Sequence, residues 1–155
     1  MVDTLWRISN YNTLDGLGGE RADGRWHTAE RGKRIAYLAE SPALAILETL
    51  VNLKGSPDLL PDTFQLLEIA MEESASIEEA PKLTKGWESA LARTQSIGDR
   101  WLLKRESALL KVPAAVAPYS FNYLLNPLAP GAGSLKIKSA GRVAYDRRLF
   151  RLVTR

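Results

Sequence analysis

Residues 24–53 read GRWHTAERGKRIAYLAESPALAILETLVNL, and this stretch predicts an interior strand followed by a helix. Residues 34–39 are apolar on both alternating faces after Arg34, which is typical of a strand buried inside a sheet. Ser41 and Pro42 predict a helix start, because serine is favoured at the N-cap and proline at the first helical position. The strand therefore passes almost directly into a helix that we expect to run to Leu53.

The predicted helix carries one carboxylate inside an otherwise apolar segment. Apolar side chains cover more than half of its circumference, and Glu48, Thr49 and Asn52 form a narrow polar strip. A helix this apolar must be buried on most sides, so its polar strip faces either a cleft or a thin band of solvent. Because Tyr37 lies in the preceding strand and Arg25 precedes that strand, we favour a cleft with Glu48 at its centre.

The remaining chain interleaves strands and short helices without a regular βαβ rhythm. This pattern predicts an α+β protein with a mixed or antiparallel β core and short helices, in one domain over residues 1–155. Gly98 separates two of the predicted helices. The expected strands are 5–8, 63–71, 107–112, 121–125 and 135–138, with final edge elements at 142–145 and 149–153, helices at 86–95 and 99–105, and a turn-rich linker at 55–61.

Composition excludes several classes of protein. The chain has no cysteine, so it has no disulfide, thiolate nucleophile or cysteine metal site. His27 is the single histidine, which argues against a zinc enzyme and against a Ser-His-Asp triad unless His27 is its base. There is no apolar run of about 18 residues and no signal-like N-terminus, so we expect no membrane association and a cytoplasmic protein.

Charge is unevenly distributed along a chain whose formal net charge is +3. Residues 68–79 are acidic without a basic residue, whereas the last stretch is basic against Asp146 alone. This stretch could bind nucleic acid, an acidic partner or phosphates, or form the solvated face of terminal strands. Its basic residues are Lys136, Lys138, Arg142, Arg147, Arg148, Arg151 and Arg155.

The residues alone leave three classes of function open. The first is an enzyme acting at a glycosidic-type carbon, in which Glu48 stabilises the positive charge that develops on the sugar. The second is a nucleic-acid binder that uses the basic C-terminal stretch, with Tyr123, Tyr145 and Phe150 as stacking groups. The third is a partner-binding module without chemistry. Loss of a small molecule that depends on Glu48 would distinguish the first class.

Several short motifs, spread in order over the chain, together resemble the RES domain. They are LWRIS, GRWH, IAYLAESPALAILETLV, GDRWLL, ALLKVP, NYLLNP and YDRRLF. The RES domain is the toxin half of a bacterial type II toxin–antitoxin pair whose antitoxin is Xre-like. Its fold is similar to that of ADP-ribosyltransferases such as diphtheria toxin, and its members act on NAD⁺ by hydrolysis, phosphorolysis or transfer of ADP-ribose to a protein.

The resemblance implies roles for particular residues. Glu48, Tyr37 and Arg25 would be catalytic: Glu48 would stabilise the oxocarbenium-like transition state, and Tyr37 would pack near the nicotinamide ribose. Arg7 or Arg25 would hold the pyrophosphate or ribose, although Arg7 could instead cap a half-exposed strand. The other implied NAD-binding residues are Trp26, His27, Trp101, Ser107 and Asn122.

The resemblance also implies a substrate and binding partners. NAD⁺ is expected as substrate without a metal, and the partners are an Xre-like antitoxin and, in the ADP-ribosyltransferase alternative, a host metabolic protein. Nucleic acid would be reached only through the antitoxin.

Two features depart from the family pattern. Ala114 stands where a Val-Pro-Ser motif is common, leaving Ser107 or Ser120 as substitutes, and the stretch from Arg25 to Tyr37 is slightly longer.

Overall fold

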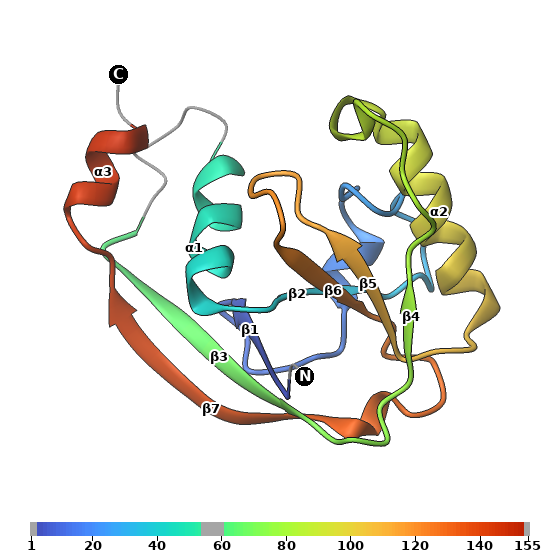
Figure 1. Ribbon diagram of the computed structural model, residues 1–155. Helices are drawn as coiled ribbons and strands as arrows, with labels where there is room; N and C mark the ends of the chain where they lie inside the picture. Colours follow the sequence, from blue (N-terminus) through green and yellow to red (C-terminus); the bar gives the residue numbers. More distant parts are fainter. Residues whose placement is uncertain (1–2, 54–60, 154–155) are drawn as a thin grey trace.

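A computed structural model describes residues 3–53 and 61–153 of the chain (Figure 1). The predicted linker at 55–61 lies, apart from Pro61, outside these residues. The described helices are α1 (Pro42–Val51), α2 (Leu91–Lys104) and α3 (Arg148–Val153), with 3-10 turns η1 (Leu17–Glu20), η3 (Trp87–Ser89) and η4 (Ala132–Ser134). The strands are β1 (Thr4–Ile8), β2 (Ala36–Ala39), β3 (Thr63–Met71), β4 (Ile77–Glu79), β5 (Leu109–Pro113), β6 (Phe121–Leu125) and β7 (Leu135–Ala144).

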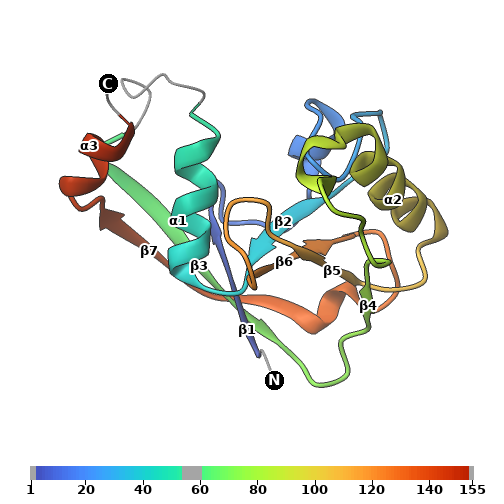
Figure 2. The same ribbon diagram turned by 45° about the horizontal axis from the view of Figure 1, so that its top comes forward.

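Within the described residues, the strands form one sheet in the order β4-β5-β6-β2-β1-β3-β7. All neighbouring strands pair antiparallel except β4 and β5, which are parallel. The predicted α+β class with a mixed, mainly antiparallel core is therefore confirmed. Figures 1 and 2 show α1 and α2 on either side of the short strands β2, β6 and β5, while the long β3–β7 ribbon curves beneath them.

The middle of the sheet is buried on both faces. In β6, Tyr123 and Leu125 belong to one apolar cluster, whereas Leu124 belongs to another that includes residues of α2. Successive side chains of a strand point to opposite faces, so the continuous apolar run in β6 is explained by a layer on each side. The same alternation in β2 places Tyr37 against the α2 cluster.

The start of α1 follows the predicted N-cap. The Leu44 backbone N–H donates to Ser41 Oγ at 3.1 Å, and Pro42 occupies the first turn. The helix ends at Val51, with Asn52 as its C-cap, slightly before the expected Leu53. The predicted strands at 63–71 and 121–125 are confirmed residue for residue.

Gly98 does not separate two helices, because α2 runs without a break through it. A Cβ built on Gly98 would overlap the carbonyl oxygen of Trp26. The glycine thus allows α2 to lie directly against the backbone of the Trp26 segment. The sequence-based expectation was wrong because it weighed the low helix propensity of glycine and could not see this contact.

The C-terminal stretch also differs from expectation. Residues 135–144 form one long strand rather than two short ones, and 149–153 belong to α3 rather than to an edge strand. The acidic residues of the β3 region pair with the basic residues of β7, as in Lys138 with Glu68 at 3.7 Å and Lys136 with Glu72 at 3.8 Å. Part of the basic charge is therefore balanced within the sheet.

Two of the aromatic residues proposed to stack nucleic-acid bases are buried. Tyr123 is 4% exposed in the main apolar cluster, and Tyr145 is 5% exposed against Phe64 with ring centroids 4.3 Å apart. A side chain buried in the core cannot stack on a base. The expectation that these two tyrosines form a stacking surface is wrong, which weakens the nucleic-acid alternative.

Candidate functional site

Three adjoining hollows between α1, the middle strands and the loop at residues 18–25 all include Asn52 in their lining. The central hollow has a volume of about 190 Å³ and the two flanking ones about 290 Å³ and 300 Å³. We call their union the cleft. Its polar lining includes Arg7, Arg25, His27, Tyr37, Glu48, Thr49, Asn52 and Asn122. The polar strip of α1, Arg25 and Tyr37, which the sequence analysis placed at a cleft, all contribute to this lining.

Glu48 projects from α1 and is oriented by the neighbouring sheet. Asn122 of β6 donates from Nδ2 to Glu48 Oε1 at 2.8 Å. Among the ion pairs of residues 3–53 and 61–153, none involves Glu48. The carboxylate is thus half-buried and positioned by a neutral amide, and its negative charge is not neutralised by a neighbouring cation. Such a group can stabilise positive charge on a bound molecule.

Arg7 lies on β1 next to Tyr37. Its Nη1 donates to the Tyr37 carbonyl oxygen at 3.1 Å. Burial lowers the pKa of Arg7, and the nearby Asp15 carboxylate opposes this effect. A guanidinium has five N–H donors, so the remaining ones are available to an anion in the cleft. Arg7 is more than a cap of a half-exposed strand, because it connects two strands and lines two of the three hollows.

Tyr37 is anchored through its hydroxyl group. The Trp26 backbone N–H donates to this oxygen at 3.2 Å, and the oxygen lies 2.7 Å from His27 Nδ1. The Gly19 carbonyl oxygen, 3.0 Å from His27 Nε2, can only accept, so Nε2 donates to it, and in the neutral ring Nδ1 then accepts from the Tyr37 hydroxyl. Burial raises the pKa of Tyr37. A Cβ on Gly24 would overlap the tyrosine hydroxyl, so this glycine permits the close approach.

Arg25 reaches the cleft from the segment before β2. Its Nη1 donates to the Glu88 carbonyl at 2.8 Å, and its own carbonyl accepts from Thr94 Oγ1 at 2.6 Å. These contacts tie it to η3 and α2. Arg25 lines the same flanking hollow as Glu48, despite the slightly longer stretch between Arg25 and Tyr37.

Three residues implied as NAD-binding lie in the core around α2. Trp26 is 2% exposed and packs against Trp87 with ring centroids 6.0 Å apart, although part of it borders one hollow of the cleft. Trp101 donates from Nε1 to Ser107 Oγ at 2.8 Å, and Ser107 donates to Glu78 at 3.3 Å. Trp101 and Ser107 are not among the residues that line the cleft. The structure therefore does not bring these two residues together with Glu48.

Asn52 was recognised only as part of the polar strip and not as a site residue. It lines all three hollows and follows Glu48 by one helical turn. The spacing of four residues on one polar strip was the signal that could have identified it. Ala114 is 5% exposed in an apolar cluster with Ala39 and Leu44, which explains how this position accommodates a methyl group.

Two further structural findings concern metals and membranes. In the part of the chain that the structure describes, no cluster of three or more histidine, aspartate or glutamate side chains could hold a metal ion. No helix among these residues has the length and apolar character needed to cross a membrane.

The fold places the chain in a known structural class. It superposes on a chain of the crystal structure of the Mycobacterium tuberculosis MbcT–MbcA toxin–antitoxin complex with a TM-score of 0.71 at 17% identity. The match covers 97% of this chain and 88% of that one. The architecture is therefore the α+β fold found in that complex.

The family is shown by sequence comparison. Residues 4–146 match the RES domain, and the chain belongs to this family. It is 43% identical over 146 residues to a Pseudomonas putida protein named Toxin Res, covering 94% of this chain and 99% of that protein. It is 34% identical over 163 residues to a Sphingobium protein named Prs ADP-ribosylating toxin, covering 97% of this chain and 99% of that protein.

Proposed function

We propose that this RES-domain protein is the toxin of a toxin–antitoxin pair and acts in the cytoplasm by cleaving the nicotinamide–ribose bond of NAD⁺. The observation that carries the proposal is the Glu48 carboxylate, which is held by Asn122 at 2.8 Å inside the cleft without a cationic partner among the described residues. The toxin names of relatives that align along nearly the whole chain support the biological role. The partner is then a cognate, Xre-like antitoxin, and nucleic acid is reached only through it.

The proposed chemistry follows from charge. When the bond between the ribose carbon and the nicotinamide nitrogen breaks, its electron pair leaves with nicotinamide, which becomes neutral. The ribose is left with oxocarbenium-like positive charge, which a fixed carboxylate stabilises. Glu48 provides that carboxylate, and the Asn122 amide keeps it oriented. Water adds to the ribose carbon and loses a proton, which yields ADP-ribose; phosphate would yield the corresponding phosphorylated product.

Arginines supply the binding energy in this proposal. Arg7 and Arg25 each use one N–H group on a backbone carbonyl and retain further donors for the NAD⁺ pyrophosphate. Because both line the same hollow as Tyr37, they can hold the dinucleotide beside this tyrosine. Tyr37 then provides an anchored aromatic surface beside the nicotinamide ribose.

A second candidate is transfer of ADP-ribose to a host metabolic protein. It is favoured by the name of the Sphingobium relative, an ADP-ribosylating toxin. The bond that breaks is the same, and a side chain of the acceptor protein replaces water. Glu48 keeps its role in both reactions.

Product identification tests the proposal. The purified protein is incubated with NAD⁺ alone, with phosphate, or with a cell lysate, and nicotinamide, ADP-ribose, its phosphorylated form and modified proteins are measured. We expect Glu48→Gln to slow NAD⁺ loss by about 10²-fold or more, because it removes the stabilising charge at nearly constant shape. Glu73→Gln, an exchange at an exposed carboxylate, is the matched control. Undiminished turnover by Glu48→Gln at native stability would refute the assignment.

A further inference from the structure

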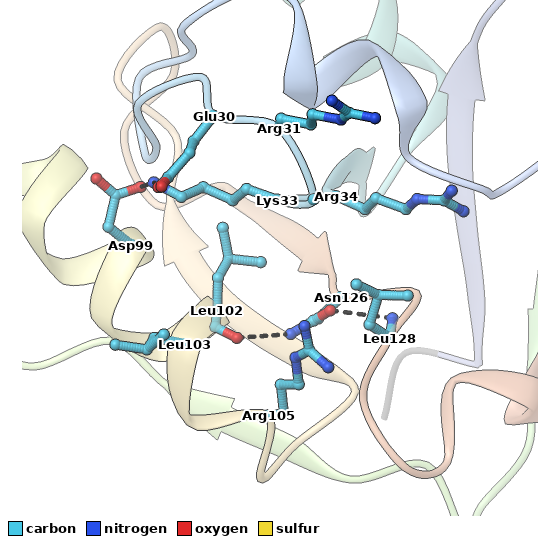
Figure 3. A pocket seen from close by; sticks show the side chains of 11 residues that line it. Glu30, Arg31, Lys33, Arg34, Asp99, Leu102, Leu103, Arg105, Asn126 and Leu128 are labelled. Atoms are coloured by element: carbon cyan, nitrogen blue, oxygen red, sulfur yellow. Dashed lines mark hydrogen bonds and ion pairs between the residues drawn. The ribbon is translucent and has the colours of Figure 1, made fainter.

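A second hollow lies outside the cleft, where the 30–34 loop, the end of α2 and the segment after β6 meet (Figure 3). Its volume is about 280 Å³, and it shares no lining residue with the cleft. Its basic lining consists of Arg31, Lys33, Arg34 and Arg105. A ligand in this hollow would not contact Glu48.

The positive charge around this hollow is only partly balanced. Lys33 is paired with Asp99 at 3.0 Å and Glu30 at 3.6 Å. Arg31 and Arg105 are both exposed, and neither has an ion pair among those of the described residues. Two guanidinium groups are therefore available to carboxylates of another molecule.

The backbone conformation of Arg105 is unfavourable for any residue that has a Cβ. It ends α2 with φ 52° and ψ 35°, in the left-handed region. Glycine or asparagine is the usual residue at such a helix end, because a Cβ crowds the backbone there. Residues in such strained conformations cluster at functional sites, and the Arg105 side chain is among those that line this hollow (Figure 3).

The rim also exposes leucine side chains. Leu103 is 84% exposed and Leu128 is 39% exposed, and both line the hollow. The floor is rigid, since Asn126 donates to the Leu102 carbonyl at 3.1 Å and accepts from the Leu128 N–H at 3.0 Å. Arginine is enriched in protein interfaces, and the exposed leucines add apolar surface beside it. None of the described residues that line the hollow is aromatic, so they do not provide what base stacking requires.

We propose that this surface binds an acidic segment of the cognate antitoxin, with carboxylates on Arg31 and Arg105 and a large apolar side chain between Leu103 and Leu128. The inference rests on the proposed toxin–antitoxin function. Charge complementarity defines the chemistry of the bound segment, because the unpaired arginines favour carboxylates and the leucines favour an apolar anchor. Since the surface lies outside the cleft, the contact adds affinity without using any residue of the proposed chemistry.

Binding measurements with charge-reversed variants test the proposal. The antitoxin is the purified product of the reading frame adjacent to the gene, and its affinity for the full-length toxin is measured by calorimetry at two salt concentrations. We expect Arg31→Glu and Arg105→Glu each to weaken binding by about tenfold or more and to reduce its salt dependence. Leu103→Ala should weaken binding without changing the salt dependence. Lys85→Glu, at an exposed lysine outside the hollow, is the control.

Arg105→Gly separates a docking role from a structural one. It removes the guanidinium and relieves the left-handed strain, so we expect weaker antitoxin binding together with a melting temperature higher by about 2–4 °C. NAD⁺ consumption by each free variant should equal that of the wild type.

Three results would overturn the inference. Unchanged affinity of all these variants would refute the docking surface while leaving the proposed function in place. If the variants lose binding to inorganic pyrophosphate or to an oligonucleotide while their affinity for the antitoxin is unchanged, the surface binds another anion and not the antitoxin. Absence of wild-type antitoxin binding would refute both the partner and the surface, and the NAD⁺ assay would then report separately on the chemistry.

Discussion

Tyr37 connects several segments of this protein through its backbone and its side chain. Its carbonyl accepts from Arg7, and its hydroxyl joins the Trp26 backbone to the His27 ring. The ring also contributes to the α2 cluster. A tyrosine at this point therefore combines a core role, which most buried tyrosines have, with a place in the cleft lining.

The hydroxyl group of Tyr37 should contribute measurably to stability. Tyr37→Phe keeps the ring but leaves the buried Trp26 N–H without its acceptor, so we expect the free energy of unfolding to fall by about 1–3 kcal/mol. Chemical denaturation measures this loss. Tyr11→Phe, at a tyrosine that is 74% exposed, should change stability by less than about 0.5 kcal/mol. Equal stability of Tyr37→Phe and the wild type would contradict the observed hydrogen bonds.

The position of Glu48 follows from local sequence, whereas its orientation depends on the tertiary structure. Its place on the polar strip follows from helix periodicity, whereas its partner Asn122 lies 74 residues later in the chain. Local sequence therefore predicts where the carboxylate points, and the sheet determines what orients it.

At the scale of elements, α2 is positioned by a close contact with the segment that carries Arg25 and Trp26. Gly98 brings the helix onto the Trp26 backbone, and Thr94 one turn earlier donates to the Arg25 carbonyl at 2.6 Å. The helix thus fixes the segment that carries Arg25 into the cleft. A change in the packing of α2 would consequently shift Arg25 in the candidate site.

Gly98→Ala should destabilise the protein although alanine is the better helix former. Alanine favours the helix by about 1 kcal/mol, but overpacking costs about 1–3 kcal/mol, occasionally more. The Cβ would overlap a backbone atom, the Trp26 carbonyl oxygen, so we expect a cost at the upper end of this range. We expect a net loss in thermal denaturation. Ser96→Ala, at an exposed position of the same helix, should be near neutral. A more stable Gly98→Ala variant would show that α2 can move away without penalty.

At the scale of the molecule, the sheet places the long β3–β7 ribbon at one end, and α2 lies towards the other (Figure 1). Residues of β1 and β2, in the middle of the strand order, line the cleft. Asp99 helps to join α2 to the loop that precedes β2. It accepts from the Thr28 N–H at 2.9 Å, from Thr28 Oγ1 at 2.6 Å and from Lys33 Nζ at 3.0 Å. This carboxylate therefore contributes to global stability.

Acid unfolding should report on Asp99. Burial alone would raise the pKa of Asp99, but the hydrogen bonds from Thr28 and Lys33 outweigh it, so the folded pKa is lowered. A lowered folded pKa gives stability that is present above the ordinary carboxyl pKa of about 3.9 and is lost as the pH falls through the folded value. We expect Asp99→Asn to be less stable at pH 7 and to show a shallower loss below about pH 4, measured by urea denaturation. A pH slope equal to that of the wild type would contradict this role.

Much of this protein follows from its sequence alone. Capping and periodicity determine α1 at Ser41–Pro42, the strands at 63–71 and 121–125, and the polar strip that carries Glu48, because these signals are local and lie within a few residues of one another. The short motifs quoted in the sequence analysis likewise predicted a RES domain, and the match of residues 4–146 to that domain confirms the prediction.

Only the tertiary structure decided the remaining features. The unbroken path of α2 through Gly98, the continuous strand β7 and the helical α3 depend on contacts with distant segments. The same holds for the cleft, where Arg7, Glu48 and Asn122 meet, while Trp101 and Ser107 are kept around α2. The physical reason is that propensity acts along the chain, whereas strand pairing and close backbone packing bring together residues that no local pattern relates.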